Sequence, residues 1–344
     1  MSPGALLALA FPDRVAKRRA GEGVNFLLAN GRGGALDPAS ALAREPLLAV
    51  AEITGTAASS RIVLAAPVAA AEIDALFAGQ IDERDQVSFD RATASLRGRR
   101  SCHLGALVLV EQTRPVAPDA DTAKLLAEGI AALGIDRLPW SQPQLQWRNR
   151  VMFLRKATDL GFTRDRHIIE PKSAIADLGG KEWPDLSDAA LARTANDWLG
   201  PRLYDKTARA QISADDLAAA LDALLPWQLR QRLDAEAPTH FTAPSGSQVP
   251  IDYEAAEGPK LSIRVQELFG LGRHPTVAGG RVPLLVELLS PAHRPVQITR
   301  DLPGFWRGSY AQVKAEMKGR YPKHPWPDDP LTAPATRRAK RRGE

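Results

Sequence analysis

Three prolines near the C-terminus, Pro322, Pro325 and Pro327, limit most strongly what this chain can form. Proline lacks a backbone N–H and restricts the residue before it, so residues 321–327 can be neither helix nor central strand and are predicted to be an extended arm. Tyr321 and Trp326 lie on this arm. We expect these aromatic side chains either to strap the arm over the last domain or to form a basic, aromatic surface for nucleic acid.

A helix is predicted just before the arm, bracketed by Gly304 and Gly319, with Gly319 as its C-terminal cap. Val313 and Met317 are four residues apart and give it one apolar face, and lysines lie on the adjacent face. The basic residues of this region are candidate nucleic-acid contacts: Arg307, Lys314 and Lys318.

The length of 344 residues is enough for two or three domains, and the 44% of hydrophobic residues is enough to build cores. The sequence has no apolar run long enough for a membrane span and no basic region before its first apolar patch, so we expect neither a membrane segment nor a signal peptide. The single cysteine, Cys102, excludes an internal disulfide and a cysteine-rich zinc site. We therefore expect a cytoplasmic location.

The net charge of +5 is concentrated at the C-terminal end. Residues 331–344 contain five basic residues and one acidic residue, so the rest of the chain carries only +1. This segment is short, flanked by proline and poor in large apolar residues, and we predict that it is a disordered basic tail. Such a tail can add nonspecific affinity for phosphate or serve only solubility.

Residues 23–68 alternate short apolar runs with glycine-rich turns, which predicts a small antiparallel β-barrel. Asn30-Gly31 favours a tight hairpin with Arg32 at its tip. Residues 5–19 are predicted to begin as a helix that breaks at Pro12, and the basic cluster after it is either a solvated helix face or a phosphate contact. The candidate nucleic-acid contacts of this cluster are Lys17, Arg18 and Arg19.

The next segments predict a short helix over residues 69–81 and strands over residues 86–116 that extend or flank the barrel. A hairpin turn is predicted across residues 97–100, where Arg-Gly-Arg-Arg separates an alternating run from an apolar one. Arg99 and Arg100, in this predicted turn, are further candidate nucleic-acid contacts.

Residues 118–236 are predicted to be mainly helical, and residues 237–300 return to strands. One of the predicted helices, over residues 144–161, is rich in basic residues and is either a helix with a solvated basic face or a nucleic-acid contact. The fold class is therefore α+β. The predicted divisions are a barrel with short helices over 1–115, a helical region over 116–236, an α+β domain over 237–330 and the tail over 331–344.

Two sets of sequence stretches carry a resemblance to a known family. FWRGSYAQVKAEMKGRYPKHPWPDDP, at residues 305–330, with LLVELLSPAHRPVQITRDL before it, resembles the C-terminal end of the HrpB family of bacterial DEAH-box helicases of superfamily two. ALLALAFPDRVAKRR, NFLLANGRGGAL and LLAVAEI are similar to the region that follows the motor and helical bundle in that family. The resemblance covers most of the chain, at both ends and in order.

This resemblance implies that the barrel is an oligonucleotide-binding (OB) fold at the exit of a nucleic-acid channel, and that Arg32, at the hairpin tip, is a further candidate nucleic-acid contact. It also implies that the two RecA-like motor domains, with their ATP and Mg²⁺, lie upstream and outside this chain. The partners would be single-stranded RNA or DNA and the motor domains.

The sequence itself contains no phosphoryl-transfer machinery. It has no Walker lysine loop, no D-E-A-D or D-E-x-H box and no other hydrolase motif, so we predict no catalytic, cofactor-binding or metal-binding residue in this chain. The expected function is an accessory, nucleic-acid-binding region of an ATP-dependent RNA helicase. The alternative is a protein-docking or bracing module without RNA affinity of its own. A shared face for the six candidates of this half of the chain would favour the first hypothesis, and scatter would favour the second; they are Lys17, Arg18, Arg19, Arg32, Arg99 and Arg100.

Overall fold

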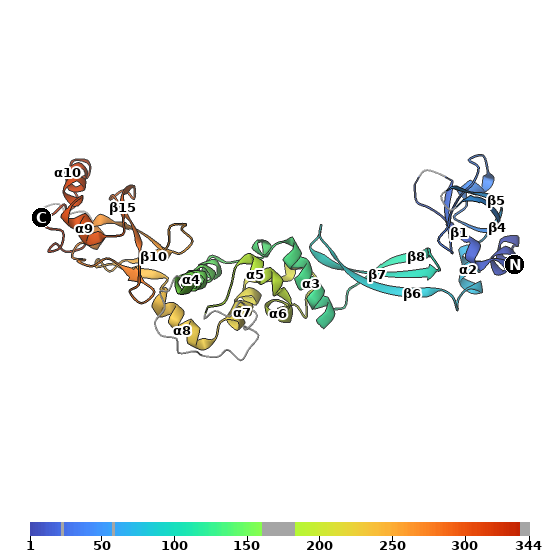
Figure 1. The fold of residues 1–344 in the computed structure, drawn as a ribbon, viewed down its shortest axis with the longest axis horizontal. Coiled ribbons are helices and arrows are strands. Elements are labelled where there is room, and N and C mark those ends of the chain that lie inside the picture. Colours follow the sequence, from blue (N-terminus) through green and yellow to red (C-terminus); the bar gives the residue numbers. More distant parts are fainter. Residues whose placement is uncertain (22–23, 57–58, 160–182, 338–344) are drawn as a thin grey trace. The chain divides into compact units, whose positions relative to one another are not determined.

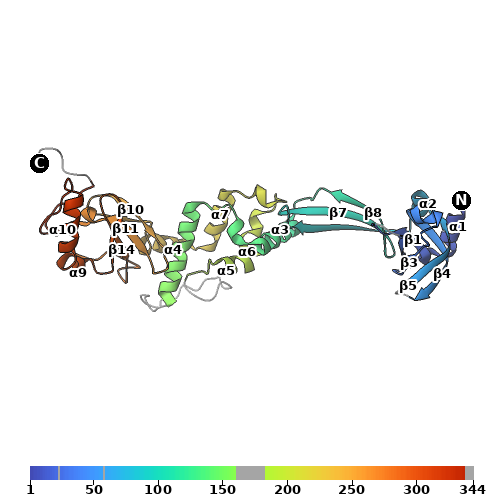
Figure 2. The same cartoon turned by 90° about the horizontal axis from the view of Figure 1, so that it is seen from above.

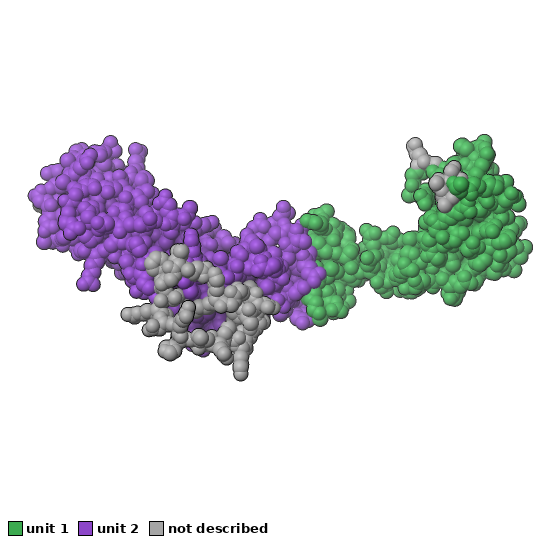
Figure 3. All heavy atoms as spheres, in the orientation of Figure 1, with its two compact units in different colours: residues 1–126 green, residues 127–344 purple. Residues whose placement is uncertain are grey.

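The computed structural model describes residues 1–21, 24–56, 59–159 and 183–337. The chain divides into two compact units, residues 1–126 (unit 1) and 127–344 (unit 2), and the division falls within helix α3, Ala120–Leu133 (Figure 3). Both units mix helices and strands, so the predicted α+β class is confirmed. Among the described residues, no helix is both long enough and apolar enough to cross a membrane.

Unit 1 contains a closed five-stranded barrel with the strand order β1-β2-β3-β5-β4. All neighbouring strands are antiparallel except β3 and β5, which pair in parallel. The predicted barrel is therefore confirmed. Its strands are β1 (Val15–Arg18), β2 (Asn25–Leu28), β3 (Gly33–Ala35), β4 (Leu47–Thr56) and β5 (Ser59–Pro67).

Alternate side chains of these strands fill the barrel. The interior residues include Ala16, Phe26, Leu28, Leu48, Val50 and Ile62. Gly34 also faces this interior, and a Cβ there would lie 3.0 Å from Cγ1 of Ile62, so glycine lets the strands approach. The predicted turn at Asn30-Gly31 joins β2 to β3, with Gly31 at a φ of +85°.

The predicted helix that breaks at Pro12 is confirmed, but the basic residues after the break do not lie on a helix face. Helix α1, Pro3–Ala10, ends before Pro12, and residues 15–18 form strand β1. Val15 and Ala16 explain the strand, because these neighbours face two different cores. Only an extended backbone directs successive side chains to opposite sides.

A second core joins the barrel to the elements around it. Helices α1 and α2 (Ala70–Leu76) and the turn between β7 and β8 pack on the outside of the barrel, where Val15, Leu47, Ile73 and Leu107 are among the buried residues. The backbone N–H of Ala106 donates to the carbonyl of Ala29 at 2.8 Å. Gly105 permits this approach, since a Cβ at its position would lie 2.3 Å from the Ala29 oxygen.

A three-stranded antiparallel sheet completes unit 1, with strands β6 (Asp82–Asp90), β7 (Ser95–Leu104) and β8 (Leu107–Arg114) in that order. The predicted turn across residues 97–100 is wrong, because β7 runs through them without interruption. The chain reverses instead at residues 91–94, where the Asp90 carboxylate accepts hydrogen bonds from Ala92 N and Thr93 Oγ1, and at residues 105–106.

The first part of unit 2 is helical, as predicted. Its helices are the end of α3, then α4 (Gln142–Asp159), α5 (Asp188–Arg193), α6 (Ala195–Trp198), α7 (Ala214–Leu224) and α8 (Trp227–Glu236) (Figures 1 and 2). Ser213 caps α7 by accepting from Asp216 N at 3.1 Å, and the Asp216 carboxylate accepts from Ser213 N at 2.8 Å. This capping box begins the helix where the sequence predicts it.

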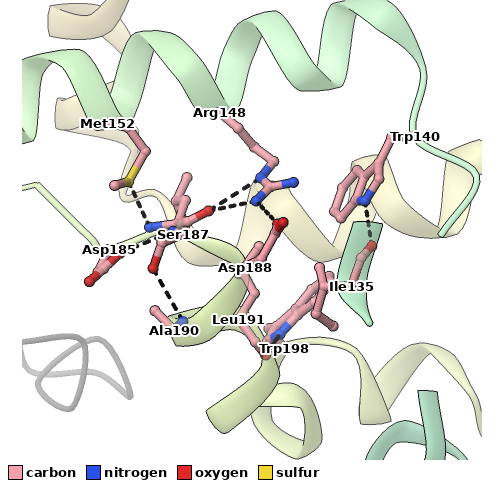
Figure 4. A network of polar contacts seen from close by, with 11 residues as sticks. Ile135, Trp140, Arg148, Met152, Asp185, Ser187, Asp188, Ala190, Leu191 and Trp198 are labelled. Carbon is pink, nitrogen blue, oxygen red and sulfur yellow. Dashed lines mark hydrogen bonds and ion pairs between the residues drawn. The ribbon is translucent and has the colours of Figure 1, made fainter. Parts of the chain in front are cut away.

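Helix α4 buries two of its arginines in this helical region. Arg148 donates to the Leu186 carbonyl at 2.8 Å and to the Asp188 carboxylate at 2.6 Å, and its guanidinium lies over the Trp140 ring (Figure 4). Arg150 donates to the carbonyls of Ala237 and Leu233. The side chains of Arg148 and Arg150 are therefore neither a solvated face nor a nucleic-acid contact.

The second part of unit 2 is a mixed sheet with the order β15-β14-β11-β10-β9, in which only β11 and β14 are parallel. The strands are β9 (His240–Thr242), β10 (Gln248–Asp252), β11 (Lys260–Arg264), β14 (Leu285–Leu289) and β15 (Pro295–Thr299). A short ribbon pairs β12 (Thr276–Val277) with β13 (Val282–Pro283). This confirms that the chain returns to strands after residue 237.

The single helix predicted between Gly304 and Gly319 is two helices, α9 (Leu302–Arg307) and α10 (Tyr310–Arg320). The break falls at Gly308, and Gly304 and Gly319 lie inside the helices. Gly304 belongs to the first turn, where its N–H donates to the capping carboxylate of Asp301 at 2.9 Å. The C-terminal cap is Tyr321 rather than Gly319.

The proline-rich arm packs as a strap, which is the first of the two predicted alternatives. Trp326 is buried and donates to the Tyr321 carbonyl at 3.2 Å, and the Tyr310 hydroxyl donates to the Pro327 carbonyl at 3.0 Å. The contacts continue into the predicted disordered tail, because Arg337 donates to the Ser245 carbonyl at 3.1 Å. Disorder is therefore wrong for residues 331–337, and residues 338–344 lie outside the described residues.

We expect Arg150→Met to destabilise unit 2 by ~3 kcal/mol, because the side chain is buried and its loss removes the hydrogen bonds that it donates to the carbonyls of Ala237 and Leu233 and to the Asp234 carboxylate. Lys156→Met is the matched control, since Lys156 is an exposed cation of the same helix. All seven tryptophans lie in unit 2, so tryptophan fluorescence during urea unfolding reports this unit alone. Equal unfolding midpoints for the two variants would contradict the structural role of Arg150.

Candidate nucleic-acid interface

The basic residues selected from the sequence lie in three places. One group is on the barrel, Lys17, Arg18, Arg19 and Arg32; a second is on β7, Arg99 and Arg100; and a third is on α9 and α10, Arg307, Lys314 and Lys318. The first two groups belong to unit 1 and the third belongs to unit 2.

Two of the barrel residues hold the fold together. The Lys17 ammonium donates to the carbonyls of Val108 and Leu109 at 2.6 and 2.9 Å, so it fastens β8 to the barrel. Arg32 donates through Nε to Ser60 Oγ at 2.9 Å and through Nη2 to the Gly55 carbonyl at 2.7 Å. These bonds use two of the three N–H donors of Lys17 and two of the five of Arg32, so the fold holds both side chains in place.

Arg18 and Arg19, at the end of β1, are exposed, and within the described part of the chain neither side chain has a hydrogen-bond partner. The Arg19 guanidinium lies beside Gly33 of β3, with Nη2 3.7 Å from the position a Cβ would take. Strand β3 pairs with β5 at Arg61, whose salt bridge to Asp37 is exposed.

Two large apolar side chains follow Arg61 on β5 and are more than half exposed, Val63 at 54% and Leu64 at 58%. We call Arg18, Arg19, Arg61, Val63 and Leu64 the barrel-edge patch. Arg61, Val63 and Leu64 are not among the residues selected from the sequence. In a regular strand successive side chains point to opposite faces, so the sequence does not show that the consecutive residues Val63 and Leu64 are both exposed. The signal lies in the irregular pairing of β4 with β5 near Glu52, which only the structure displays.

Arg99 and Arg100 are successive residues of β7, so their side chains point to opposite faces of the sheet. They cannot share a face, and each is paired with a carboxylate. Arg99 Nη1 lies 2.8 Å from Glu111 Oε1, and Arg100 pairs with Glu83, which raises the pKa of Arg100. Exposed pairs of this kind contribute little stability and compete with phosphate for the same donors.

The face of the sheet that carries Arg99 is hollowed by about 700 Å³. Its charged lining residues are Asp90, Arg91, Arg97, Arg99 and Glu111. Arg97 Nε lies 2.6 Å from Asp90 Oδ2, and this contact, with N–H and O–H donors from Ala92 and Thr93, lowers the pKa of Asp90 to about 2. Two of its three arginines are thus paired with its two carboxylates, and the formal charge of the lining is only +1.

The third group offers two exposed cations. Lys314 is paired with Asp328, whose pKa it lowers. Arg307 and Lys318 are exposed, and the described residues include no side-chain partner for either. Within the described ranges, no group of three or more His, Cys, Asp or Glu residues could hold a metal ion. The barrel-edge patch thus combines two unpartnered arginines at the end of β1 with two exposed apolar side chains on β5, and Gly33, which lies beside Arg19, belongs to β3, the strand that pairs with β5.

Comparison with known proteins relates the chain to one group of helicases. Residues 198–330 match the family HrpB_C, described as ATP-dependent helicase C-terminal. The ATP-dependent RNA helicase HrpB of Escherichia coli strain K12 is 38% identical over 338 residues, which are 98% of this chain and 39% of that protein.

Two solved structures agree with this relationship. The crystal structure of the E. coli DExH-box NTPase HrpB matches with a TM-score of 0.57 and 38% identity, over 98% of this chain and 39% of that chain. The crystal structure of the E. coli DEAH/RHA helicase HrpB matches with a TM-score of 0.50 and 34% identity, over 94% and 38% of the two chains. The predicted resemblance to the C-terminal region of these helicases is confirmed, and this chain spans about two fifths of their length.

We expect the Asp90 carboxyl to titrate near pH 2 in the folded protein, measured by its ¹³C NMR shift. Arg97→Gln should move the midpoint toward the ordinary value of 3.8, whereas Arg84→Gln, on a different pair, should not. Because the folded pKa is depressed, the contribution of Asp90 to stability is present above pH 3.8 and is lost as the pH falls through about 2. A midpoint near 3.8 in the parent protein would contradict the turn geometry.

Proposed function

We propose that this chain, which corresponds to the C-terminal region of the HrpB helicases, is an accessory region of an ATP-dependent RNA helicase and contributes nucleic-acid contacts through its barrel. ATP and Mg²⁺ would be bound by motor domains outside this chain, and the protein would act in the cytoplasm. The observation that carries the proposal is the barrel-edge patch, with two unpartnered arginines on a barrel of suitable topology.

The topology supports an OB-fold assignment for this barrel. The strand order is β1-β2-β3-β5-β4, and pairing of β1 with β4 closes the barrel. Strands β3 and β5 are parallel. This order and closure match the five-stranded Greek-key barrel of the OB fold. OB folds bind oligonucleotides on strands 2 and 3 and on the loops after strands 1 and 4. Arg18 and Arg19 lie where β1 ends, and Arg19 reaches β3.

The expected contact is electrostatic and tolerant of sequence. Arginine donates to phosphate oxygens, which carry no sequence information, and exposed apolar side chains give bases a surface to pack on. The near-neutral charge of the chain outside residues 331–344 indicates modest affinity, because few phosphates would be neutralised. The motor domains would supply the remaining contacts.

We predict that Arg18→Gln with Arg19→Gln weakens binding of a labelled single-stranded RNA by about tenfold, and lowers the slope of log K against log salt by about 1.4, since each lost phosphate contact accounts for ~0.7. The measurement is fluorescence anisotropy at several salt concentrations. The matched control is Arg307→Gln with Lys318→Gln, which removes two exposed cations of unit 2.

The same measurement on residues 1–337 separates the folded body from the basic segment after it. Binding that disappears with residues 338–344, or that falls equally in both double variants, would refute the barrel-edge patch as the contact surface. Absence of binding in every form of the chain would favour the docking or bracing function instead.

We also predict no RNA-stimulated ATP hydrolysis by this chain, because the sequence lacks the phosphate-binding lysine loop and the acidic metal-binding box. The measurement is release of inorganic phosphate with and without RNA. Hydrolysis that co-purifies with the chain through successive columns would contradict the assignment of the motor to other domains.

A further inference from the structure

A groove in unit 2 takes no part in the proposed RNA contacts. It lies between helix α4 and the end of strand β10, which are neighbours in both views (Figures 1 and 2), and its volume is about 330 Å³. Its lining residues are Gln142, Pro143, Leu145, Gln146, Asn149, Ile251, Asp252, Tyr253 and Glu254. This volume falls at the lower end of the range typical of ligand sites.

The groove is acidic although the chain as a whole carries a charge of +5. Asp252 and Glu254 are its charged lining residues, and both are exposed. Asp252 accepts from Glu254 N through Oδ1 at 2.8 Å, which leaves Oδ2 available. Within the described residues, the Glu254 carboxylate has no partner. Two carboxylates without a neighbouring cation in the lining attract a positively charged group.

The wall formed by α4 carries a row of amides. Gln142, Gln146 and Asn149 are spaced four and three residues apart, so they lie on one face of the helix. Over seven residues the helix rises about 10 Å, and this is the length of about three residues of extended peptide. Amide side chains both donate and accept hydrogen bonds, as a peptide backbone requires.

Most of this amide row is free to bind. Gln146 makes one long hydrogen bond, from Nε2 to the Thr239 carbonyl at 3.4 Å. Gln142 and Asn149 make no side-chain hydrogen bond with any residue that the structure describes.

The apolar part of the groove is already in place. Tyr253 is buried, its hydroxyl donates to the Pro238 carbonyl at 2.9 Å, and its ring centroid is 5.2 Å from that of Phe153. Ile251 is buried beside it on β10, and Leu145 is half-buried on α4. Tyr253, Ile251 and Leu145 form the apolar floor of the groove. Because these side chains are already held in place, the floor can bind the aliphatic stem of a long side chain without rearrangement.

We propose that this groove docks a short extended segment of a partner protein that carries arginine or lysine. The carboxylates of Asp252 and Glu254 bind the guanidinium or ammonium group, the amide row binds the peptide backbone, and the apolar floor covers the side-chain stem. A small polyamine provides the charge and an aliphatic chain but no peptide backbone for the amide row, so charge alone does not account for the arrangement. This docking site is independent of the RNA contacts proposed for unit 1.

The test is fluorescence anisotropy with a fluorescein-labelled nonapeptide of alternating arginine and alanine, added to the whole chain. We expect Asp252→Asn with Glu254→Gln to weaken binding about tenfold, because two exposed charge pairs are lost. The matched control, Asp215→Asn with Glu257→Gln, removes two exposed carboxylates outside the groove and should leave the affinity unchanged. A third variant, Asn149→Arg, places a cation in the amide row and should weaken binding by a similar factor.

Two comparisons separate docking from nonspecific attraction. The Arg18→Gln, Arg19→Gln protein should bind the peptide as the parent does, so this site can fail or succeed independently of the RNA contacts. Spermidine at equal charge concentration should displace little of the peptide. Full displacement by spermidine, or equal weakening in the two carboxylate variants, would overturn the proposal.

Discussion

Unit 2 depends on hydrogen bonds that buried arginines of α4 donate to backbone carbonyls of neighbouring segments. The last carbonyls of a helix lack intrahelical partners. At the end of α8, Arg150 donates to the carbonyl of the capping residue Ala237 and also to the Leu233 carbonyl, which accepts from the Ala237 N–H as well. A cation at this end also complements the helix dipole. Arg148 does the same for the segment that enters α5, where it binds the Leu186 carbonyl and the Asp188 carboxylate (Figure 4). A guanidinium suits both places because it carries five donors in one plane.

This use of arginine explains why the basic helix was ambiguous in the sequence. Its spacing shows an apolar stripe beside a basic stripe, and that pattern is the same whether the basic side chains meet water, phosphate or carbonyl oxygens. The acceptors for Arg148 and Arg150 come from residues 38 to 87 positions further along the chain. Periodicity within one helix carries no information about such distant partners.

Much of the remaining fold could be predicted, because its signals are local. The barrel follows from short apolar runs and a turn at Asn30-Gly31, and α7 follows from the capping pair Ser213 and Asp216. Two of the errors arise from glycine. Gly98 was interpreted as part of a turn but lies inside β7, and Gly319 was interpreted as a cap but lies inside α10. A glycine marks a chain reversal only where no neighbouring strand pairs with it. At Gly98, pairing with Arg114 of β8 keeps the backbone of β7 extended.

The candidate site shows the same limit, since the sequence identifies the cations and the structure decides which are available. Lys17, Arg32, Arg99 and Lys314 are engaged by carbonyls or carboxylates, whereas Arg18 and Arg19 are not. Counting charges would rank Arg99 and Arg18 equally. The difference is that a phosphate at Arg99 must displace Glu111, whereas a phosphate at Arg18 displaces only water. The acidic groove beside α4 follows the same logic with the opposite sign, because its carboxylates have no cation to displace. The charges that the fold leaves unpaired therefore determine what each of these two surfaces can bind. The net charge of the chain predicts neither the RNA contact nor the peptide contact.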